Sequence, residues 1–538
     1  MSPVLPIAYV PETFSDEETD VLRRYFTNVD GPVFALVNLP EVVKGALFAR
    51  YSRSAKSLRR LFLDEFVGEL DISADDGLDA TVGLSRAEEL YERIFVEYGD
   101  DSVAQLGGVH LACEQASNVL TKVLEWGRLM SYLEQSTRYV PYDGRLAGRY
   151  RYHRDPDVVG SRFGTRYVGD MDRIFDAYSL LLDKVTEHVR AVVPRSAEDS
   201  DFVYRSATRA KALDAVRGVL PAATLSNVGI YGSGQAYEAL LLRMRAHPLP
   251  EARTYAELML SELRKVVPSF LRRVDLPERG GVWSDYLART RAETAGVVGR
   301  LIGRAPVEET ATVTLVDFDP EAEDKLLAAI CYPHAAMGER QLLGRVRSLG
   351  DTDRVELLRA YVGERVNRRH RPGRAFERTD YRFDVLSDYG AFRDLQRHRL
   401  LTIEWQALTP NHGYTRPELV DEAGMTGVFD EAMERSAALY DVLAPHFPEQ
   451  AAYAVSMAYR IRYVMQFNAR EAMHLLELRS APQGHPSYRR IAQEMHRQIS
   501  DVAGHRAIAA AMTHLSSGEP ELERLEAERR AERRRLGT

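Results

Sequence analysis

Apolar residues recur at three- and four-residue steps over much of this chain, which is the spacing of one face of an α-helix. The pattern predicts helices at residues 40–68, 85–138, 170–193, 252–267, 320–332, 417–443 and 486–515. Strand-like sequence is scarcer and is clearest at residues 311–316, directly before an Asp-Pro helix start at Asp319. We therefore expect a helix-rich chain with a smaller share of strands.

A boundary between two domains is expected near residue 305. Chain breakers gather just before the strand at residues 311–316, namely Pro277, Gly280, Gly281, Gly303 and Pro306. The predicted domains are residues 1–305, with an insert near residues 142–175, and residues 306–520. Residues 521–538 are predicted to be a charged, solvated helical tail, because acidic and basic side chains interleave there.

The two halves show a weak internal repeat. Residues 232–243 align with residues 468–479 at a constant offset, 468 − 232 = 236, and both segments end in Leu-Arg, at Arg243 and Arg479. Because amphipathic helices share leucines at helical spacing, this alignment needs independent support.

Composition and charge exclude several classes of protein. There are 71 basic and 79 acidic residues, a net charge of −8, which argues against a surface that tracks nucleic acid. The two cysteines, Cys113 and Cys331, are too few for a disulfide framework or a cysteine metal site, and there is no His-Glu-x-x-His motif, so no metal is expected. The longest apolar run covers residues 326–332, and no leader is apparent, so we expect a cytoplasmic protein without a membrane partner.

Polar clusters suggest anion binding, although each has a plainer interpretation. In residues 128–139, Glu134 and Arg138 are either a surface ion pair on a helix or part of a set that grips an anion. The run at residues 396–399 is by default solvated charge. Asn468 and Glu471 have the form of a helix cap, which places Arg470 and His474 on one helix face.

Together these clusters resemble the flavin-dependent thymidylate synthase family. The family signature is Arg-His-Arg, two residues, Ser, four residues, Ser-x-Arg, followed later by an Asn-x-Arg helix that ends in Leu-Arg and a His. The first half matches it at Arg128, Ser131, Glu134, Ser136, Arg138 and Tyr139, preceded by the family-like stretch Asp101-Ser-Val103. Trp126 and Gly127 replace the first Arg and the His, and Leu106 replaces a His that usually contacts flavin.

The second half shows the reverse pattern of retention. Arg397, His398, Arg399 and Thr402 match the start of the signature, whereas Ala407 and Thr409 replace its end. The flavin-binding helix is matched by Asn468, Arg470, His474, Arg479 and His485. In the first half Gly232 and Gly234 replace that Asn and Arg, while Arg217, Arg243 and His247 are kept; the equivalent of Arg217 is Tyr453, since 217 + 236 = 453.

The resemblance implies an α+β fold of two tandem copies, each with helices packed on a mostly antiparallel sheet. It implies reductive methylation of dUMP to dTMP with methylenetetrahydrofolate, NADPH and tightly bound FAD, without a cysteine nucleophile. It also implies a homodimer that forms a pseudo-tetramer.

The complementary losses suggest one composite site. The nucleotide side would comprise Arg243 as the catalytic group and Arg128, Ser131, Glu134, Gln135, Ser136, Arg138, Arg217 and His247 as substrate-binding groups. The flavin side would comprise Arg397, His398, Arg399, Asn468, Arg470, His474, Arg479 and His485. The alternative is a degenerate, non-catalytic homologue that binds nucleotide or flavin in a regulatory or scaffold role. Random loss of signature residues would not preferentially keep the contacts to one ligand in each half. The pattern therefore favours the active enzyme.

Overall fold

The chain folds into two compact units, and each unit takes segments from both halves of the sequence. The computed structural model describes residues 8–39, 43–44, 47–48, 51, 54–65, 105, 107–197, 199–303, 306, 308–518, 522 and 524–536. Unit 1 comprises Met1–Ser179, Leu220–Val307 and Glu434–Val455, and unit 2 comprises Leu180–Val219, Glu308–Met433 and Ser456–Thr538.

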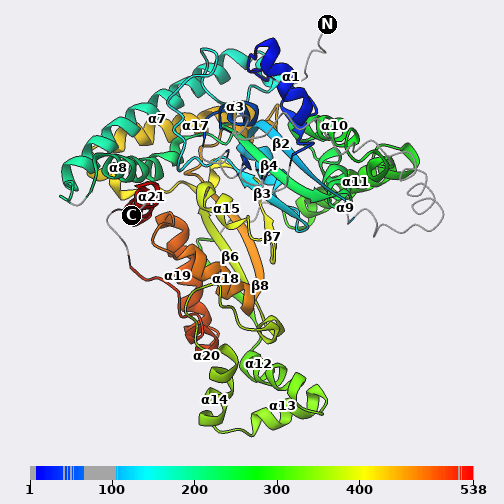
Figure 1. Ribbon diagram of the computed structural model, residues 1–538, viewed down its shortest axis with the longest axis vertical. Helices are drawn as coiled ribbons and strands as arrows, with labels where there is room; N and C mark the ends of the chain where they lie inside the picture. Colours follow the sequence, from blue (N-terminus) through cyan, green and yellow to red (C-terminus); the bar gives the residue numbers. More distant parts are fainter. Residues whose placement is uncertain are drawn as a thin grey trace. The chain divides into compact units, whose positions relative to one another are not determined.

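Unit 1 is built on an antiparallel sheet in the order β1-β2-β4-β3 (Figure 1, blue to green). Its strands are β1 (Val33–Ala35), β2 (Gly108–Ser117), β3 (Met130–Glu134) and β4 (Leu225–Ser233). Its helices are α1 (Asp16–Tyr25), α3 (Leu58–Glu65), α5 (Asn118–Leu124), α6 (Pro156–Val159), α9 (Gly234–Arg245), α10 (Pro250–Arg264) and α11 (Val282–Leu301).

Unit 2 repeats this strand order as β5-β6-β8-β7, again antiparallel (Figure 1, yellow to orange). Its strands are β5 (Val313–Phe318), β6 (Asp380–Asp388), β7 (Thr402–Trp405) and β8 (Arg460–Asn468). Its helices are α8 (Asp201–Val216), α12 (Ala322–Cys331), α13 (Glu339–Arg347), α14 (Asp351–Val362), α15 (Tyr389–Leu395), α16 (Glu418–Glu422), α18 (Ala469–Arg479), α19 (Pro486–Asp501), α20 (Arg506–Ala510) and α21 (Leu525–Leu536).

The predicted α+β class is confirmed, and most of the predicted helices are found. The predicted stretches at 170–193, 252–267, 320–332, 417–443 and 486–515 correspond to α7 (Gly164–Val192), α10, α12, α16 with α17 (Thr426–Leu443), and α19 with α20. The predicted strand at 311–316 is β5. Both α10 and α19 begin with proline in the first turn, at Pro250 and Pro486, where its fixed φ and missing N–H are no cost.

The predicted helix at residues 85–138 is wrong over its described part. That part contains two strands, β2 and β3, joined through the short helix α5. Side chains of β2 are buried in succession, from Leu111 to Cys113, so its sequence lacks the alternation of a half-exposed strand. Strand β8 shows the opposite case, because buried Ile461, Tyr463, Met465 and Phe467 alternate with more exposed residues.

Two long helices carry the chain from one unit into the other. The division falls within α7, after Ser179, and within α17, before Glu434. In unit 1 the first part of α7 meets the second part of α17, where Arg435 forms an ion pair with Asp170 at 3.2 Å. Both exchanged segments end at equivalent positions, since 455 − 219 = 236.

Tyr453 anchors the exchanged segment in unit 1. Its hydroxyl donates to Glu251 Oε2 at 2.8 Å, and the same oxygen accepts the Ser117 hydroxyl at 2.6 Å. Ser117 is also the N-cap of α5. Because Glu251 is only 2% exposed, these donors satisfy a carboxylate that water does not reach well.

Arg217 anchors the exchanged segment in unit 2 at the equivalent place. It forms an ion pair with Asp394 at 3.3 Å, and its charge also acts on Asp388, which is the N-cap of α15 and accepts the Ser487 hydroxyl. Ser487 is equivalent to Glu251, since 487 − 251 = 236. The carboxylate and the hydroxyl have therefore changed places between the two units.

The C-terminal helix forms as expected but is not a freely solvated tail. Arg524 is 4% exposed and pairs with Asp214 of α8 at 3.0 Å. Arg529 of α21 pairs with Asp199, which lies just before α8, at 2.6 Å. The charges of the tail are thus used to hold α8 within unit 2.

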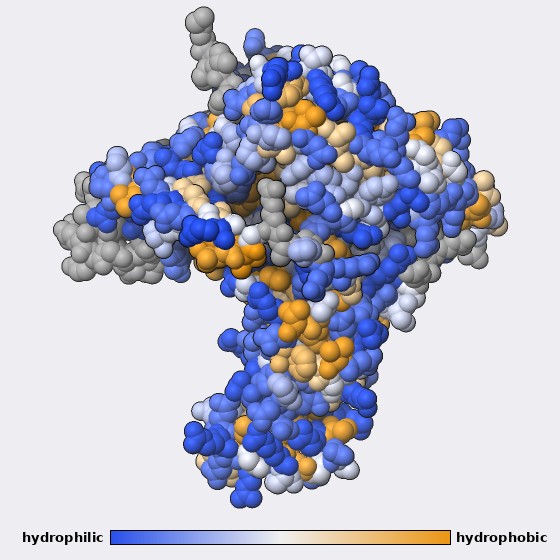
Figure 2. Space-filling view, turned by 180° about the vertical axis from the view of Figure 1, so that it is seen from behind, coloured by the Kyte–Doolittle hydropathy of each residue, from blue (hydrophilic) through white to orange (hydrophobic). Residues whose placement is uncertain are grey.

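The face of the molecule drawn in Figure 2 is predominantly polar. Figure 2 shows hydrophilic residues over most of the face it presents, with hydrophobic residues gathered in separate patches. None of the helices in the described part of the chain combines the length and the apolar sequence needed to cross a bilayer.

Replacing Tyr453 with Phe should lower the free energy of unfolding by about 1–3 kcal/mol, because buried Glu251 loses a hydrogen-bond donor. Urea denaturation measures the change. The matched control is Tyr332→Phe, since Tyr332 is 57% exposed and its hydroxyl can be replaced by water. Equal stability of the two variants would show that the hydroxyl of Tyr453 does not anchor the exchanged segment.

Candidate functional site

The predicted site residues divide between the two units. Unit 1 holds Arg128, Ser131, Glu134, Gln135, Ser136, Arg138, Arg243 and His247, whereas unit 2 holds Arg217, Arg397, His398, Arg399, Asn468, Arg470, His474, Arg479 and His485. Arg217 was expected with the nucleotide-side residues, but it packs in the unit that carries the flavin-side residues. The family-like stretch Asp101-Ser-Val103 and Leu106 lie outside the described residues.

The first-half signature lies on strand β3 and the turn after it. Glu134 ends the strand, so Glu134 and Arg138 do not share a helix face, which rules out the interpretation of the two as an ion pair on a helix. Glu134 is buried and lies 3.3 Å from Lys122 Nζ, which also pairs with Glu125 at 2.5 Å. Lys122 was not singled out from the sequence, because a lysine in an apolar run resembles the edge of a helix.

Other members of the first-half signature differ in how open they are. Gln135 donates to the carbonyl of Ser54 at 2.5 Å and is buried, so its contacts are internal. The Ser136 hydroxyl accepts from the backbone N–H of Arg138 at 3.3 Å, and Arg138 is only 9% exposed. Arg128 and Ser131 are exposed at the surface of unit 1.

Arg243 is a partly desolvated cation next to an aromatic ring. Its guanidinium carbon lies 5.3 Å from the centroid of the Trp126 ring, and burial lowers the pKa of Arg243 below its usual value. Within the part of the chain that the structure describes, Arg243 makes no ion pair or hydrogen bond. A Cβ atom on Gly127 would lie 3.5 Å from Arg243 Nη2 and only 2.5 Å from the Tyr132 hydroxyl, so glycine keeps this space open.

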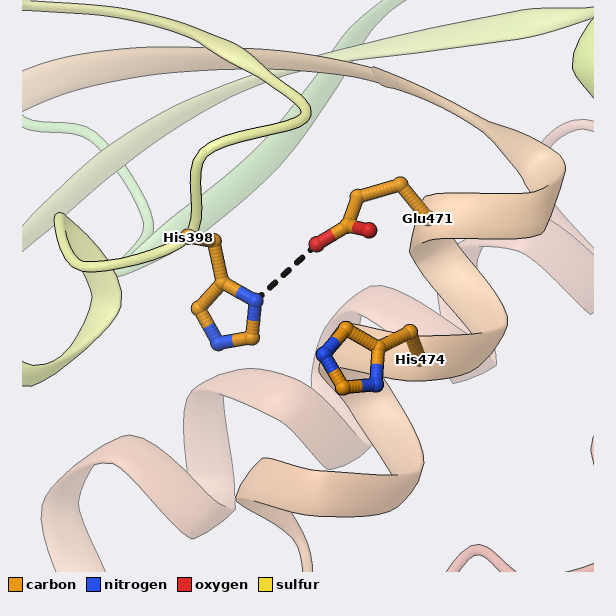
Figure 3. Close-up of side chains that lie close together, drawn as sticks. All are labelled: His398, Glu471 and His474. Atoms are coloured by element: carbon orange, nitrogen blue, oxygen red, sulfur yellow. Dashed lines mark hydrogen bonds and ion pairs between the residues drawn. The ribbon is translucent and has the colours of Figure 1, made fainter. Parts of the chain in front are cut away.

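His398, Glu471 and Arg479 form a hydrogen-bonded chain in unit 2. His398 Nδ1 lies 3.0 Å from Glu471 Oε1, and Arg479 Nε donates to His398 Nε2 at 3.0 Å. Figure 3 shows His398 on a loop, opposite Glu471 and His474 on helix α18. Asn468 caps this helix by accepting from the backbone N–H of Glu471 at 2.9 Å, so the predicted cap is confirmed.

The surroundings of His398, Glu471 and Arg479 are strongly cationic. Burial raises the pKa of Glu471 to about 7, against the opposing influence of Arg371, Arg470 and Arg399. Burial, followed by Arg371, Arg368 and Arg479, lowers the pKa of His474 to about 4. Burial and Arg479 hold the pKa of His398 well below its usual value. Both imidazoles are therefore neutral near pH 7.

His398, Glu471 and His474 have the chemical types of a metal-binding set, which the sequence reasoning did not anticipate. One ligand atom from each lies within 4.8 Å of the others. A metal would need a lone pair on the histidine nitrogens, yet Nε2 of His398 accepts from Arg479 and Nδ1 faces a carboxylate. Nearby arginines also oppose a divalent cation, so the arrangement favours an anionic ligand.

A buried ion pair fixes the loop that carries the additional arginines. Arg365 and Glu477 pair through both of their terminal atoms at 2.6 Å, and each side chain is 1% exposed. Arg365 also donates to the carbonyl of His370 at 2.6 Å. The pair thus ties the loop containing Arg368 and Arg371 to helix α18, and neither arginine was predicted from the sequence because neither belongs to the family signature.

The remaining flavin-side residues lie at the ends of helices and on loops. Arg470 donates to the carbonyl of Pro372 at 3.0 Å and pairs with Glu377 at 3.2 Å. Arg399 is exposed and Arg397 is half-buried. His485 caps α19 by accepting from the N–H of Ser487 at 3.2 Å, so its Nε2–H donates to the carbonyl of Asp214 at 3.0 Å.

A cavity of about 710 Å³ lies beside Arg217 within unit 2. Its lining includes Asp388, His485, Ser487 and Arg460. Arg217 is 3% exposed, and its Nη2 is a buried donor for which the described residues supply no hydrogen-bond acceptor. Arg217 is therefore both an anchor of the exchanged segment and one of the residues that line a cavity.

Comparison with known proteins identifies the family. Residues 60–269 and 314–504 each match the family model described as thymidylate synthase complementing protein. Among solved structures, a UMP/dUMP methylase PolB from Streptomyces cacaoi bound with 5-Br dUMP is similar at 19% identity and a TM-score of 0.29, over 39% of this chain and 97% of that chain.

Similar proteins of nearly the same length occur in bacteria and archaea. A UPF0159 protein of Chlamydia muridarum is 40% identical over 521 residues, which cover 96% of this chain and 98% of the relative. A UPF0159 protein of Chlamydia pneumoniae is 38% identical over 91% of this chain and 93% of the relative. One from Thermoplasma acidophilum is 31% identical over 90% of this chain and 97% of the relative.

His247 gives unit 1 a testable dependence on pH. Burial, Arg291 and Arg253 lower the pKa of His247 to about 4, while its Nδ1 accepts from the N–H of Leu249 at 3.1 Å. An unfolded histidine titrates near pH 6.5, so this contribution to stability is complete above pH 6.5 and is lost as the pH falls toward 4. Replacing His247 with Asn, which keeps an acceptor but does not titrate, should reduce the stability difference between pH 7 and pH 5 by about 1–2 kcal/mol.

Urea denaturation of both proteins at the two pH values measures this difference. The control is His334→Asn, because His334 is exposed. An unchanged pH dependence in the His247 variant would contradict the assignment.

Proposed function

Because this chain belongs to the family of thymidylate synthase complementing proteins, we propose that it is a flavin-dependent thymidylate synthase. It methylates dUMP to dTMP, taking the one-carbon unit from methylenetetrahydrofolate and reducing equivalents from NADPH. The observation that carries this proposal is the match of both halves to one family model. The repeated strand order of the two sheets supports a duplicated form of the family's domain.

The nucleotide is bound by unit 1 side chains. Arg138 and Ser136 hold the phosphate of dUMP, since a guanidinium fork and a hydroxyl match phosphate oxygens. Arg243 stabilises negative charge on the uracil ring, which its partly desolvated position and lack of a carboxylate partner among the described residues support. Arg128, Ser131, Glu134, Gln135 and His247 complete the nucleotide side of the proposed site.

FAD is held by residues of unit 2. The donor set fits an anionic cofactor, because several arginines act on the buried Glu471 and on His474. Arg397, His398, Arg399, Asn468, Arg470, His474, Arg479 and His485 are the proposed contacts. When bound, FAD supplies the hydride chemistry that no side chain can provide.

Arg217 contributes a buried donor to the same unit. Its Nη2 lacks an acceptor among the described residues, and Arg217 is one of the residues that line the cavity in unit 2, which supports contact with a phosphate group. The proposed unit 2 site therefore combines one residue from the first half of the sequence with residues of the second half. In solution we expect a homodimer whose four domains form a pseudo-tetramer.

The thiols are unsuited to act as nucleophiles, which agrees with a route that does not use them. Cys113 is fully buried, and burial raises the pKa of its thiol far above neutral pH. Burial also raises the pKa of Cys331. Because the thiolate is the nucleophilic form, neither cysteine is activated for attack on the uracil ring.

Two measurements on the purified full-length protein test the proposed function. Flavin absorbance is expected in the isolated protein or after FAD is added. Tritium release from 5-tritiated dUMP is expected only when NADPH and methylenetetrahydrofolate are both present. A protein that binds dUMP or FAD without releasing tritium would instead be the non-catalytic homologue, and a protein that never binds FAD would exclude the flavin-dependent reaction.

The division of binding between the units is tested by two substitutions. Arg138→Ala should weaken dUMP binding by about 10- to 100-fold, the usual loss of a charge-assisted hydrogen bond, while FAD binding is retained. Arg470→Ala should do the opposite. Calorimetric titration with each ligand measures both, with Arg289→Ala as the control because Arg289 is exposed on α11. Loss of the same ligand in both variants would contradict the division.

A further inference from the structure

Helix α18 carries a buried carboxylate that the helix itself does not need. Glu471 is 4% exposed, and its backbone N–H already donates to the Asn468 side chain that caps the helix. In a reciprocal capping box the glutamate side chain would turn back to the cap residue, whereas here it points to His398 (Figure 3). Burying this carboxylate is costly, so the contact that it makes is the feature to explain.

The hydrogen-bonding pattern fixes the tautomer of His398. Arg479 Nε can only donate, so His398 Nε2 must carry the lone pair that accepts at 3.0 Å. The ring proton therefore sits on Nδ1 and donates to Glu471 Oε1, also at 3.0 Å. An acceptor oxygen is available on Glu471 in either protonation state, so the pattern does not depend on the charge of the carboxyl group.

Unit 1 provides an internal comparison in which this chain of hydrogen bonds is missing. Gln235 is equivalent to Glu471, since 471 − 235 = 236, and Gly127 stands in the signature where the second half has His398. Without an imidazole, Arg243 packs over Trp126 instead. Arg243, near the end of α9, thus lies over the ring of Trp126, whereas Arg479, at the end of α18, lies 5.4 Å from the centroid of the Tyr488 ring and also donates to His398.

We propose that Glu471 is a positioning residue, which locks His398 in the Nδ1–H tautomer so that His398 Nε2 holds Arg479 in one orientation toward the anionic ring of a bound ligand. The identity of that ligand rests on the proposed function, but the tautomer lock does not. If the ring proton moved to Nε2, two donors would face each other and the hydrogen bond from Arg479 to His398 would be lost.

The tautomer can be measured without any ligand by nitrogen NMR of the full-length protein labelled with ¹⁵N-histidine. The His398 signals are assigned by their loss in His398→Gln. At neutral pH the wild-type ring is expected to show a protonated Nδ1 and an unprotonated Nε2. A protonated Nε2, a doubly protonated ring, or stoichiometric zinc binding that shifts both His398 and His474 would overturn the proposal.

Three variants then link the tautomer to turnover. Glu471→Gln keeps an acceptor oxygen and should retain the tautomer and a kcat within about threefold of wild type. Glu471→Leu removes the acceptor and should lower kcat by about 10- to 100-fold, the usual effect of removing a partner that orients a functional side chain. Because His398 and Arg479 are proposed contacts of FAD, Glu471→Leu should also speed the dissociation of FAD, whereas Glu471→Gln should leave it within about threefold of wild type. Gln235→Leu is the matched control and should leave kcat unchanged.

The outcomes separate this proposal from the proposed function. The wild-type protein could lack synthase activity and still show the Nδ1–H tautomer, which Glu471→Leu then loses. That result would support the tautomer lock and contradict the proposed reaction. An active Glu471→Leu variant with unchanged kcat rejects the positioning role. If Glu471→Leu does not fold, the tautomer of His398 in the wild type and in Glu471→Gln still tests the proposal. Loss of the Nδ1–H tautomer in the isosteric Glu471→Gln variant would contradict it.

Discussion

The exchange of segments between the two halves is the constraint on which the rest of the structure depends. Each exchanged segment ends at a buried anchor, Tyr453 in unit 1 and Arg217 in unit 2, and the two anchors are equivalent by the internal offset of 236. Each anchor lies beside a hydrogen-bonded pair of a hydroxyl and a carboxylate. One member of each pair, Ser117 or Asp388, is the N-cap of a helix that follows a strand of the sheet. Exchange of like elements is a low-cost route to joining two similar folds, and here it occurs within one chain.

The anchors also show how two copies can diverge while the same contact survives. Unit 1 places the hydroxyl at Ser117 and the carboxylate at Glu251, whereas unit 2 places the carboxylate at Asp388 and the hydroxyl at Ser487. The same kind of reciprocity applies to the candidate site. Where unit 2 keeps an imidazole at His398, unit 1 has Gly127, which opens space beside Arg243. At both places the residue in one unit fits the neighbours that it has in that unit.

The sequence predicted the class of fold and the amphipathic helices, because both are recorded in local periodicity. The roles of the candidate residues stay a prediction, because the family signature gives their order along the chain and not their contacts. Strand β2 was predicted as a helix because its side chains are buried on both faces, which removes the alternation that identifies a strand. Glu471 was predicted only as a cap partner, since spacing along a helix does not reveal a contact with a distant loop. The exchange itself depends on contacts between residues far apart in the sequence, such as Tyr453 with Glu251, separated by 202 positions, and Arg217 with Asp394, separated by 177.

The exchanged segments have an evolutionary consequence. Once each half supplied a part of the other's unit, neither copy could be lost without leaving both units incomplete. The two halves are therefore tied together as one folding object, in which a change to the exchanged segment of either half alters the packing of the other half's unit.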